Sequence, residues 1–507
     1  MEALGEIIVL PFFGQGHLNP CMELCKQFAK LNYKAILIIP STLSSSVPTT
    51  HNPLVEVVEL PNPSPPQETA IVTVAGLKNE NGAGLYPSRD SFSTPLGRAI
   101  DNFLSERYRS SGQIPLICAV VDAMMRWSAD IFAKLNVPIA SFFTSGACHY
   151  AIEYARWKAD VDSIQPGEVR FLPGLPDNMA VNYADFIRNR RIIGGREATK
   201  TDQHEPASTP GESRHGPPGA SRRLPWWEEE RSTVLLFNTC DDLEEVIIKC
   251  IADQTGKPVY GVGPLLPEQY WKSTGSVVHD HEVRSNKATS VTEDEVMRWL
   301  SSKPEQSVIY ISFGSEVSPM SEELGELANA LEESNQAFIW VIPPGSGTPG
   351  PPRSIKTLMG REDEGGFYPY GMDEKIGNRG LLIKGWAPQL LILSHPSVGG
   401  FLSHCGWNST VEAVGRGVPI LAWPIGGDQF NNAKLIVNHL GVGHTLYTSD
   451  DSFEPMKKEQ IMKGIEMMMA DQEVHKKGKE LAAKFQGGYP SMASLKAIIH
   501  RVSDSSS

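Results

Sequence analysis

The run from Trp386 to Gln429 constrains the fold more than any other stretch, because it joins a strand directly to a helix. Within it, Gly399–Ser403 is a short apolar segment that predicts a strand, and His404–Asn408 predicts a sharp turn. The next segment, Ser409–Val414, predicts the opening of a helix that ends at the glycines just beyond it. The first N–H groups of such a helix and the positive end of its dipole favour phosphate oxygens. The pattern therefore predicts an α/β chain with an anion site at this turn.

Polar side chains surround the predicted anion site, and two interpretations of them stay open. Ser409 and Glu412 form an S-x-x-E pattern, which is typical of a capping box that satisfies the helix's own donors without a ligand. The alternative is ligand binding, which the neighbouring residues favour. Trp386 offers an aromatic face for a base, and Gln389 can bond sugar hydroxyls together with Glu412. Further polar side chains within reach of the same point are His404, Asn408, Asp428 and Gln429.

The same run resembles the signature box of the plant family 1 UDP-dependent glycosyltransferases, which begins W-A-P-Q, continues through H-C-G-W-N-S and ends D-Q. Here the box begins at Trp386, includes His404 and ends at Gln429, with the family's spacing and no insertion. The resemblance implies that family's GT-B fold. In it, two Rossmann-like α/β domains with parallel sheets face each other across a cleft.

The resemblance also implies a role for each residue of the box. The tryptophan, here Trp386, stacks on uracil, and Ala387 bonds the base through its backbone. The ribose is held by Gln389 and Glu412. The residues implied for the diphosphate are His404, Asn408 and Ser409, and those implied for the transferred sugar are Trp407, Asp428 and Gln429. In this family a terminal glutamine usually goes with glucose, so UDP-glucose is the expected donor.

Length and composition bound the remaining possibilities. A chain of 507 residues, 40% of them apolar, is too large for one core and predicts two domains. The net charge of −13 gives no support for nucleic acid or an anionic membrane surface as partner. Seven scattered cysteines without C-x-x-C pairs predict buried thiols in a reducing compartment, and no metal site is expected. No apolar run approaches the roughly 20 residues of a membrane span, and we expect a cytoplasmic, monomeric protein.

The amino-terminal segment predicts a second site. Glu6–Leu10 and Tyr33–Ile39 predict strands around a helix Pro20–Leu31, with Asn19 as its N-cap. Such a βαβ unit belongs to a parallel sheet. The turn between them nearly spells a dinucleotide fingerprint, but it lacks the third glycine and the acidic residue that follows, which argues against a nicotinamide enzyme. What remains is His17 at the carboxyl end of a first strand.

On its own, His17 is more often a structural residue than a catalytic one, and Asp122, which ends the predicted strand Leu116–Val121, could equally cap the next helix. The segment PFFGQGHLNP resembles the family's amino-terminal turn, whose histidine is the catalytic base. The resemblance implies that His17 is this base, that Asp122 orients it, and that Thr144 lies near the donor sugar. A later strand and turn resemble the family's S-F-G-S segment, so Ser315 joins the expected donor residues.

The expected domain organisation follows from composition and resemblance. Residues 1–262 form an acceptor-binding domain, 263–292 a linker, 293–485 the UDP-sugar domain, and 486–507 a terminal helix that returns to the first domain. A Pro-, Gly- and Ser-rich segment at about 192–223 predicts a mobile loop. Within the linker, His279-Asp280-His281 is interpreted as a solvated loop rather than a metal site.

The expected function is inverting transfer of glucose to a small apolar acceptor, with a flavonoid or other phenolic hydroxyl as the first expectation. Open alternatives are attachment to a flavonoid ring carbon and transfer to a terpenoid or hormone. A protein that binds the nucleotide sugar without transfer is a further alternative. No metal cofactor and no stable membrane insertion are expected. The residues expected to line the acceptor pocket, each of which could instead be core, are Phe13, Met124, Met125 and Trp127.

Overall fold

The structure is a computed structural model of the chain. It describes residues 3–47, 52–61, 95–108, 114–159, 161, 164–185, 232–272, 277–280, 289–350, 352–358, 365–447 and 455–504. The loop expected at about 192–223 lies outside the described residues.

The first half of the chain forms a sheet of parallel strands in the order β3-β2-β1-β4-β5-β8-β9. Its strands are β1 Glu6–Leu10, β2 Lys34–Pro40, β3 Val55–Leu60, β4 Leu116–Asp122, β5 Ile139–Phe143, β8 Ser232–Phe237 and β9 Val259–Gly261. The helices that accompany it are α1 Gln15–Lys30, α3 Pro95–Arg107, α4 Ala129–Ala133, α5 Ala147–Lys158, α7 Asp241–Thr255 and α8 Glu268–Lys272. The strands are nearly continuous apolar runs, as expected for a parallel sheet that is covered on both faces.

The second half repeats this plan with the strand order β12-β11-β10-β13-β14-β15, again all parallel. Its strands are β10 Val308–Ser312, β11 Ala337–Ile342, β12 Gly380–Lys384, β13 Val398–Ser403, β14 Ile420–Ala422 and β15 Gly443–Thr445. Its helices are α9 Glu293–Ser301, α10 Ser321–Glu333, α11 Arg353–Leu358, α12 Met372–Ile376, α13 Gln389–Ser394, α14 Trp407–Arg416, α15 Gln429–Lys434, α16 Lys458–Ala470 and α17 Gln472–Ala483.

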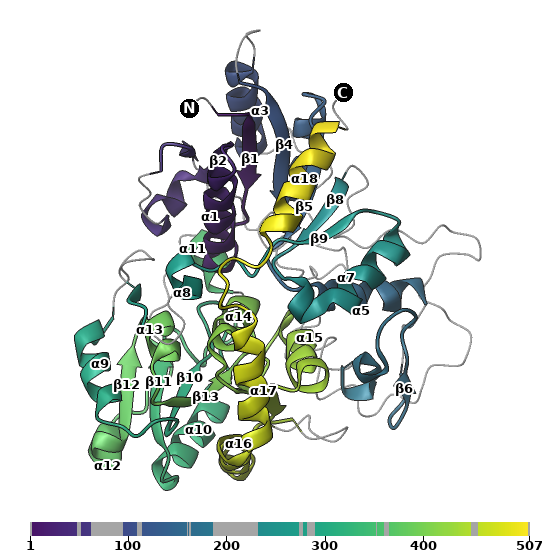
Figure 1. The fold of residues 1–507 in the computed structure, drawn as a ribbon. Helices are drawn as coiled ribbons and strands as arrows, with labels where there is room; N and C mark the ends of the chain where they lie inside the picture. Colours follow the sequence, from purple (N-terminus) through teal and green to yellow (C-terminus); the bar gives the residue numbers. More distant parts are fainter. Residues whose placement is uncertain are drawn as a thin grey trace.

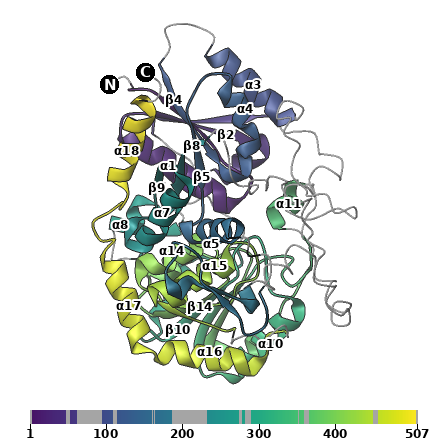
Figure 2. The same ribbon diagram turned by 90° about the vertical axis from the view of Figure 1, so that its right-hand side faces the viewer.

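The two sheets form two lobes, one above the other, and both ends of the chain lie at the upper lobe (Figure 1). The last helix, α18 Met492–Asp504, leaves the second lobe and lies against the first, beside β4 and β9. Its apolar side chains join the core of the first sheet. Figure 2 shows α16 across the bottom of the lower lobe, with α17 and α18 following one side of the molecule up to the first lobe.

A short antiparallel hairpin of the first domain, β6 Val169–Arg170 and β7 Val181–Asn182, lies near the contact between the lobes. Just beyond it, Asp185 accepts a hydrogen bond from Lys434 of α15 over 2.5 Å, and the same ammonium group also reaches a backbone carbonyl. Lys434 is only 9% exposed, so this ion pair is largely shielded from water. The two lobes are therefore held by a specific, buried polar contact as well as by apolar packing.

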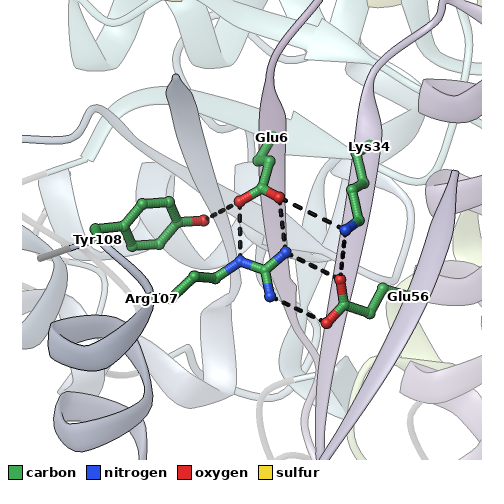
Figure 3. A network of polar contacts seen from close by, with 5 residues as sticks. All are labelled: Glu6, Lys34, Glu56, Arg107 and Tyr108. Carbon is green, nitrogen blue, oxygen red and sulfur yellow. Dashed lines mark hydrogen bonds and ion pairs between the residues drawn. The ribbon is translucent and has the colours of Figure 1, made fainter. Parts of the chain in front are cut away.

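A polar network anchors α3 to the amino ends of three strands, at the edge of the sheet opposite the site described below (Figure 3). Arg107 at the end of α3 bonds both oxygens of Glu6 on β1, at 2.6 and 3.0 Å, and both oxygens of Glu56 on β3. Tyr108 also donates to Glu6, and Lys34 on β2 pairs with Glu56 at 2.7 Å. Burial alone would raise the pKa of Glu6, but these hydrogen bonds and charges lower it. The carboxylates of Glu6 and Glu56, whose pKa values are both lowered, are therefore ionised at neutral pH.

Two local expectations were wrong. The first helix does not start at Pro20 with Asn19 as N-cap, because α1 begins at Gln15 after Gly14 and contains Pro20. The expected solvated loop around Asp280 is also anchored. Asp280 is fully buried and accepts a hydrogen bond of 2.9 Å from the backbone N–H of Leu391 in α13. A carboxylate can thus serve as a helix cap from a distant segment, which local sequence does not reveal.

All seven cysteines are free and buried, as the sequence predicts. Among the described residues, no helix is both long and apolar enough to cross a bilayer. Likewise, no group of three or more histidine, cysteine or acidic side chains is gathered to hold a metal ion in the part of the chain that the structure describes.

Candidate active site

His17 and Asp122 meet at the carboxyl edge of the first sheet. His17 lies in the first turn of α1, just after β1, and Asp122 is the last residue of β4, which pairs in parallel with β1. The Nδ1 atom of His17 is 2.7 Å from Oδ2 of Asp122. The other carboxylate oxygen, Oδ1, accepts the backbone N–H of Met124 at 2.9 Å. Asp122 was expected either to cap the next helix or to orient His17. It does both, because Oδ1 accepts the backbone N–H of Met124 and Oδ2 contacts His17.

The side chains of this pair differ in exposure, which assigns their roles. The His17 side chain is 28% exposed and that of Asp122 only 1%. With Nδ1 engaged, Nε2 is the ring nitrogen that can receive a proton from a substrate. Burial alone would lower the pKa of His17. The charge and hydrogen bond of Asp122, with the charges of Glu316 and Asp428, outweigh burial and raise the pKa above its ordinary value.

Thr144 stands on the same side of the imidazole ring as Asp122. Its hydroxyl oxygen lies 3.1 Å from Nδ1 of His17, and its carbonyl accepts a hydrogen bond from the side chain of Asn238. The residue expected near the donor sugar thus contacts the base. Phe12 packs edge-on against the imidazole, with ring centroids 5.2 Å apart. The ring of His17 is held by polar contacts on one nitrogen and by an aromatic side chain.

The box residues of the second domain gather at the carboxyl edge of the second sheet. Trp386 and Gln389 follow β12, Ser315 follows β10, His404 follows β13, and Asp428 follows β14. Because the strands are parallel, all of these segments meet at one edge, where open α/β sheets bind ligands. Ala387 is buried in the core, which leaves its backbone rather than its side chain to meet a ligand.

The capping-box interpretation of Ser409 and Glu412 was wrong. Helix α14 begins at Trp407, so both residues lie inside it rather than at its cap. Their side chains instead converge on Gln389, whose amide nitrogen is 3.0 Å from Ser409 Oγ and 2.6 Å from Glu412 Oε2. The hydroxyl of Tyr310 donates to the oxygen of the same amide at 3.0 Å. The predicted helix start was misplaced by two residues, which made Ser409 and Glu412 look like a cap although their side chains contact Gln389.

His404 is buried against two glycine turns. A Cβ at Gly314, where φ is +73°, or at Gly406 would come within 2.6 or 2.4 Å of its Nε2 atom, so only glycine leaves room for the ring. Burial, partly opposed by a hydrogen bond to the Ser312 backbone, lowers the pKa of His404 to about 4. The imidazole is therefore neutral at physiological pH. Among the described residues its buried Nδ1 has no hydrogen-bond partner, as suits an atom that meets a ligand.

The first two residues of α14 connect the second domain to the first through side-chain hydrogen bonds. The indole Nε1 of Trp407 donates to the carbonyl of Asn238 over 2.6 Å, and its ring lies against Gly146, where a Cβ would come within 2.5 Å. Trp407 is 5% exposed and its indole is directed to the first domain, so the expectation that Trp407 faces the transferred sugar stays a prediction for its backbone.

Asn408 makes the second fastening. Its side-chain amide donates to the carbonyl of Gly16 over 3.2 Å, one residue before His17. This carbonyl would ordinarily accept the N–H of the residue four positions on, which is Pro20 and has none. Because Pro20 lies inside α1, the carbonyl of Gly16 has no partner within the helix and can accept a hydrogen bond from Asn408 of α14.

Asp428 and Gln429 shape the loop between β14 and α15. The oxygen of the Gln429 side chain accepts the backbone N–H groups of Ile425 and Gly426 at 2.8 and 2.9 Å. Asp428 accepts a hydrogen bond of 2.9 Å from Asn432. Because the loop uses the oxygen of Gln429, its amide nitrogen is the part that can meet a sugar hydroxyl.

Comparison with known proteins identifies this arrangement. The family described as "UDP-glucoronosyl and UDP-glucosyl transferase" matches residues 276–482. UDP-glycosyltransferase 74E2 of Arabidopsis thaliana is 30% identical over 492 residues, which cover 95% of this chain and 93% of that protein. The chain belongs to the plant UDP-glycosyltransferase family. The resemblance of the box is thereby confirmed, and this UDP-glycosyltransferase uses a UDP-sugar as the donor.

Two further comparisons extend this result. Anthocyanin 3'-O-beta-glucosyltransferase of Gentiana triflora is 28% identical to this UDP-glycosyltransferase, with 98% of each chain covered. The crystal structure of Medicago truncatula UGT71G1 complexed with UDP-glucose superposes with a TM-score of 0.68 at 22% identity, covering 98% of both chains. The predicted GT-B fold, with two parallel-sheet α/β domains, is confirmed.

The residues expected to line the acceptor pocket of this UDP-glycosyltransferase separate into two groups. Phe13, Met124 and Trp127 are half-buried at the margin of the core near His17. Met125 is 1% exposed and packs within that core, so we do not carry it into the pocket. Sequence reasoning also missed Glu316, whose charge reaches His17 from the second domain. Its position directly after Ser315 was the available signal.

Proposed function

We propose that this UDP-glycosyltransferase transfers glucose from UDP-glucose to a hydroxyl of a flavonoid or related phenolic, with inversion at the anomeric carbon. Nε2 of His17 takes the proton of the acceptor hydroxyl while that oxygen bonds to the anomeric carbon. The bond from this carbon to the UDP oxygen breaks, and UDP leaves. The observation that carries the proposal is the His17–Asp122 pair, next to which Asn408 of α14 donates a hydrogen bond to the backbone carbonyl of Gly16, the residue before His17.

The donor side of the proposal rests on the cluster at Gln389 and on Gln429. The ribose hydroxyls would bond the Gln389–Glu412 pair, and the diphosphate would meet His404 and the amino end of α14. The amide nitrogen of Gln429 would bond a glucose hydroxyl. Two relatives that match almost the whole chain are named glucosyltransferases, of scopoletin and of anthocyanin, which supports glucose as the transferred sugar.

The acceptor side rests on half-buried apolar side chains beside the base. Phe13, Met124 and Trp127 offer surface for a flat aromatic molecule, and the Phe12 ring already contacts the His17 imidazole. Scopoletin and anthocyanin, which the two relatives are named for, support a phenolic acceptor.

The first test is transfer itself. The protein is incubated with UDP-glucose, or UDP-galactose as the control donor, and a panel of phenolics and terpenoids, and NMR of the product gives the linkage and anomeric configuration. We expect a β-O-glucoside of a phenolic. His17→Ala should lower kcat about 10²–10⁴-fold, the usual contribution of a general base, with UDP affinity unchanged. Retained activity in His17→Ala, or an α-linked product, would refute the mechanism.

Metal removal tests how the leaving group is stabilised. Negative charge develops on UDP as the glycosidic bond breaks, and the proposal assigns its stabilisation to the amino end of α14 and to His404. We therefore expect the same initial rate before and after treatment with EDTA, at saturating UDP-glucose and acceptor. Loss of activity that magnesium restores would show that a cation shares this task.

A further inference from the structure

Glu316 is a carboxylate of the donor domain that is held rigidly against the first domain. It lies in the turn after β10, and Oε2 accepts the backbone N–H of Ser354 in α11 at 2.9 Å. The carbonyl of Glu316 accepts the N–H of Arg353, whose guanidinium also bonds the carbonyl of Ser315 at 2.8 Å. Figure 2 shows α11 at the level where the two lobes meet, on the side away from α18.

The second oxygen of Glu316 lies beside the turn that precedes His17. A Cβ placed on Gly14, in the turn between β1 and α1, would lie 3.8 Å from Oε1 of Glu316, 3.9 Å from Oγ of Ser354 and 3.6 Å from Cδ2 of His17. A carboxylate oxygen, a hydroxyl and the edge of the imidazole thus surround one small volume. Because residue 14 has no side chain, the backbone of the turn leaves this volume open.

The alternative role for Glu316 is to cap α11. That role uses Oε2 alone, and among the described residues the hydrogen bonds of this carboxylate involve only that oxygen. Oε1 is therefore left to accept a hydrogen bond from a ligand. Its charge is also felt at the site, since Glu316 and Asp428 add to the effect of Asp122 in raising the pKa of His17. Negative charge from three carboxylates therefore acts on the imidazole.

We propose that Glu316 and Ser354 form an acceptor subsite for a second hydroxyl, adjacent to the one that His17 deprotonates. The subsite selects neutral vicinal diols, either a catechol ring or a sugar ring, and rejects acceptors that carry a carboxylate next to the reacting hydroxyl. This inference rests on the proposed function, because it needs His17 as the base.

The selectivity follows from the charge of the acceptor oxygen. A hydroxyl that donates to a carboxylate forms a strong hydrogen bond, which corresponds to about a tenfold to hundredfold gain in kcat/KM over an acceptor without it. A carboxylate of the acceptor in the same place is repelled by the carboxylate of Glu316. Glu316 cannot move away, because the backbone N–H of Ser354 holds it. Discrimination against anionic acceptors is expected for the same reason.

The experiment measures transfer from UDP-glucose to four acceptors: catechol, 2-methoxyphenol, salicylate and phenyl β-glucoside. In 2-methoxyphenol a methyl ether replaces the second hydroxyl of catechol. We expect wild type to prefer catechol over 2-methoxyphenol by about tenfold or more and to leave salicylate unused. Glu316→Gln should bring the catechol preference close to unity and raise turnover of salicylate. Transfer to the glucose ring of phenyl β-glucoside would identify sugar diols as substrates, and transfer to catechol alone would identify catechols.

Two variants distinguish the effect of the subsite side chains on acceptor preference from the effect of displacing α11 on the overall rate. Ser354→Ala removes the hydroxyl and should weaken the catechol preference partly. Arg353→Met loosens α11 but keeps both subsite side chains, so it should lower the rates with all acceptors alike and keep their ratio. An unchanged ratio in Glu316→Gln, or an equal loss of selectivity in Arg353→Met, would overturn the inference.

Calorimetry distinguishes failure of the inference from failure of the proposed function. Catechol and 2-methoxyphenol are titrated into wild type and Glu316→Gln in saturating UDP, which requires no transfer. If no acceptor is glucosylated, the proposed function fails, while tighter binding of catechol that is lost in Glu316→Gln still supports the subsite. Equal binding of the two phenols by wild type would refute the subsite even if glucose transfer is observed.

Discussion

At the scale of single residues, the proposed mechanism makes the protonation of His17 the determinant of the pH range of activity. A general base must be neutral in the free enzyme, and the neighbouring carboxylates raise its pKa above the usual 6.5. We therefore expect kcat/KM to fall as the pH drops through this raised pKa. Asp122→Asn removes the largest opposing charge and should move the acidic limb to lower pH while also lowering the plateau. A pH–rate profile from pH 5 to 9 measures both. An acidic limb that stays in place would show that it belongs to another group.

The same scale shows what sequence can and cannot predict about a site. The strand pattern placed His17 and Asp122 at the carboxyl ends of parallel strands, which meet at one edge of a sheet, whereas the roles expected for them came from the resemblance to the family. The direction of the Trp407 indole was not predictable. It depends on the Asn238 carbonyl and on the space at Gly146, which come from distant parts of the other domain. Sequence spacing identifies the edge of a sheet, whereas the domain contact decides which way a side chain turns.

At the scale of elements, Pro20 in α1 links helix geometry to the domain contact. Pro20→Ala would supply an N–H that competes with Asn408 for the carbonyl of Gly16. The helix gains a hydrogen bond, so we expect the midpoint of urea unfolding to stay the same or rise. The weakened contact between domains should lower kcat/KM about two- to fivefold, the value of a partly lost hydrogen bond.

A double-mutant cycle checks this explanation. In an Asn408→Ala background the contact is already gone, so Pro20→Ala should have no further effect on kcat/KM. If the two substitutions multiply their effects, Pro20 acts on activity through some other path, such as its packing beside His17.

Element boundaries were predicted less well than the elements themselves. The strand expected at Gly399–Ser403 is β13, but the next helix begins at Trp407 rather than Ser409. The error arose because Ser409 and Glu412 have the spacing of a capping box, although their real partner is Gln389 on another helix. Likewise, Asp280 is in a polar segment and is buried only because α13 needs a cap. Local patterns identify helices, and tertiary partners decide where they start.

At the scale of the whole molecule, α18 makes the first domain depend on the last residues of the chain. Leu495 is fully buried in the core of the first sheet together with Ile498, Ile499 and Val502. The segment before α18 is also fixed to that domain. The hydroxyl of Tyr489 donates to the carbonyl of Val262 and that of Ser491 to the carbonyl of Gly263, each at a distance of 2.5 Å. The helix is therefore part of the first domain, although it follows the second domain in sequence.

This placement separates stability from donor binding. Leu495→Ala leaves a cavity under the first sheet and should lower the free energy of unfolding by about 2–5 kcal/mol, measured by urea denaturation followed by tryptophan fluorescence. Lys496 is exposed on the same helix, so Lys496→Ala is the control and should change the free energy of unfolding by less than about 0.5 kcal/mol. The box residues lie on the second sheet, so UDP affinity at 25 °C, measured by calorimetry, should be the same in wild type and in both variants. If Leu495→Ala weakened UDP binding as much as it weakened folding, the two domains would have to unfold as one unit, and α18 would support the donor site as well as the acceptor-side core.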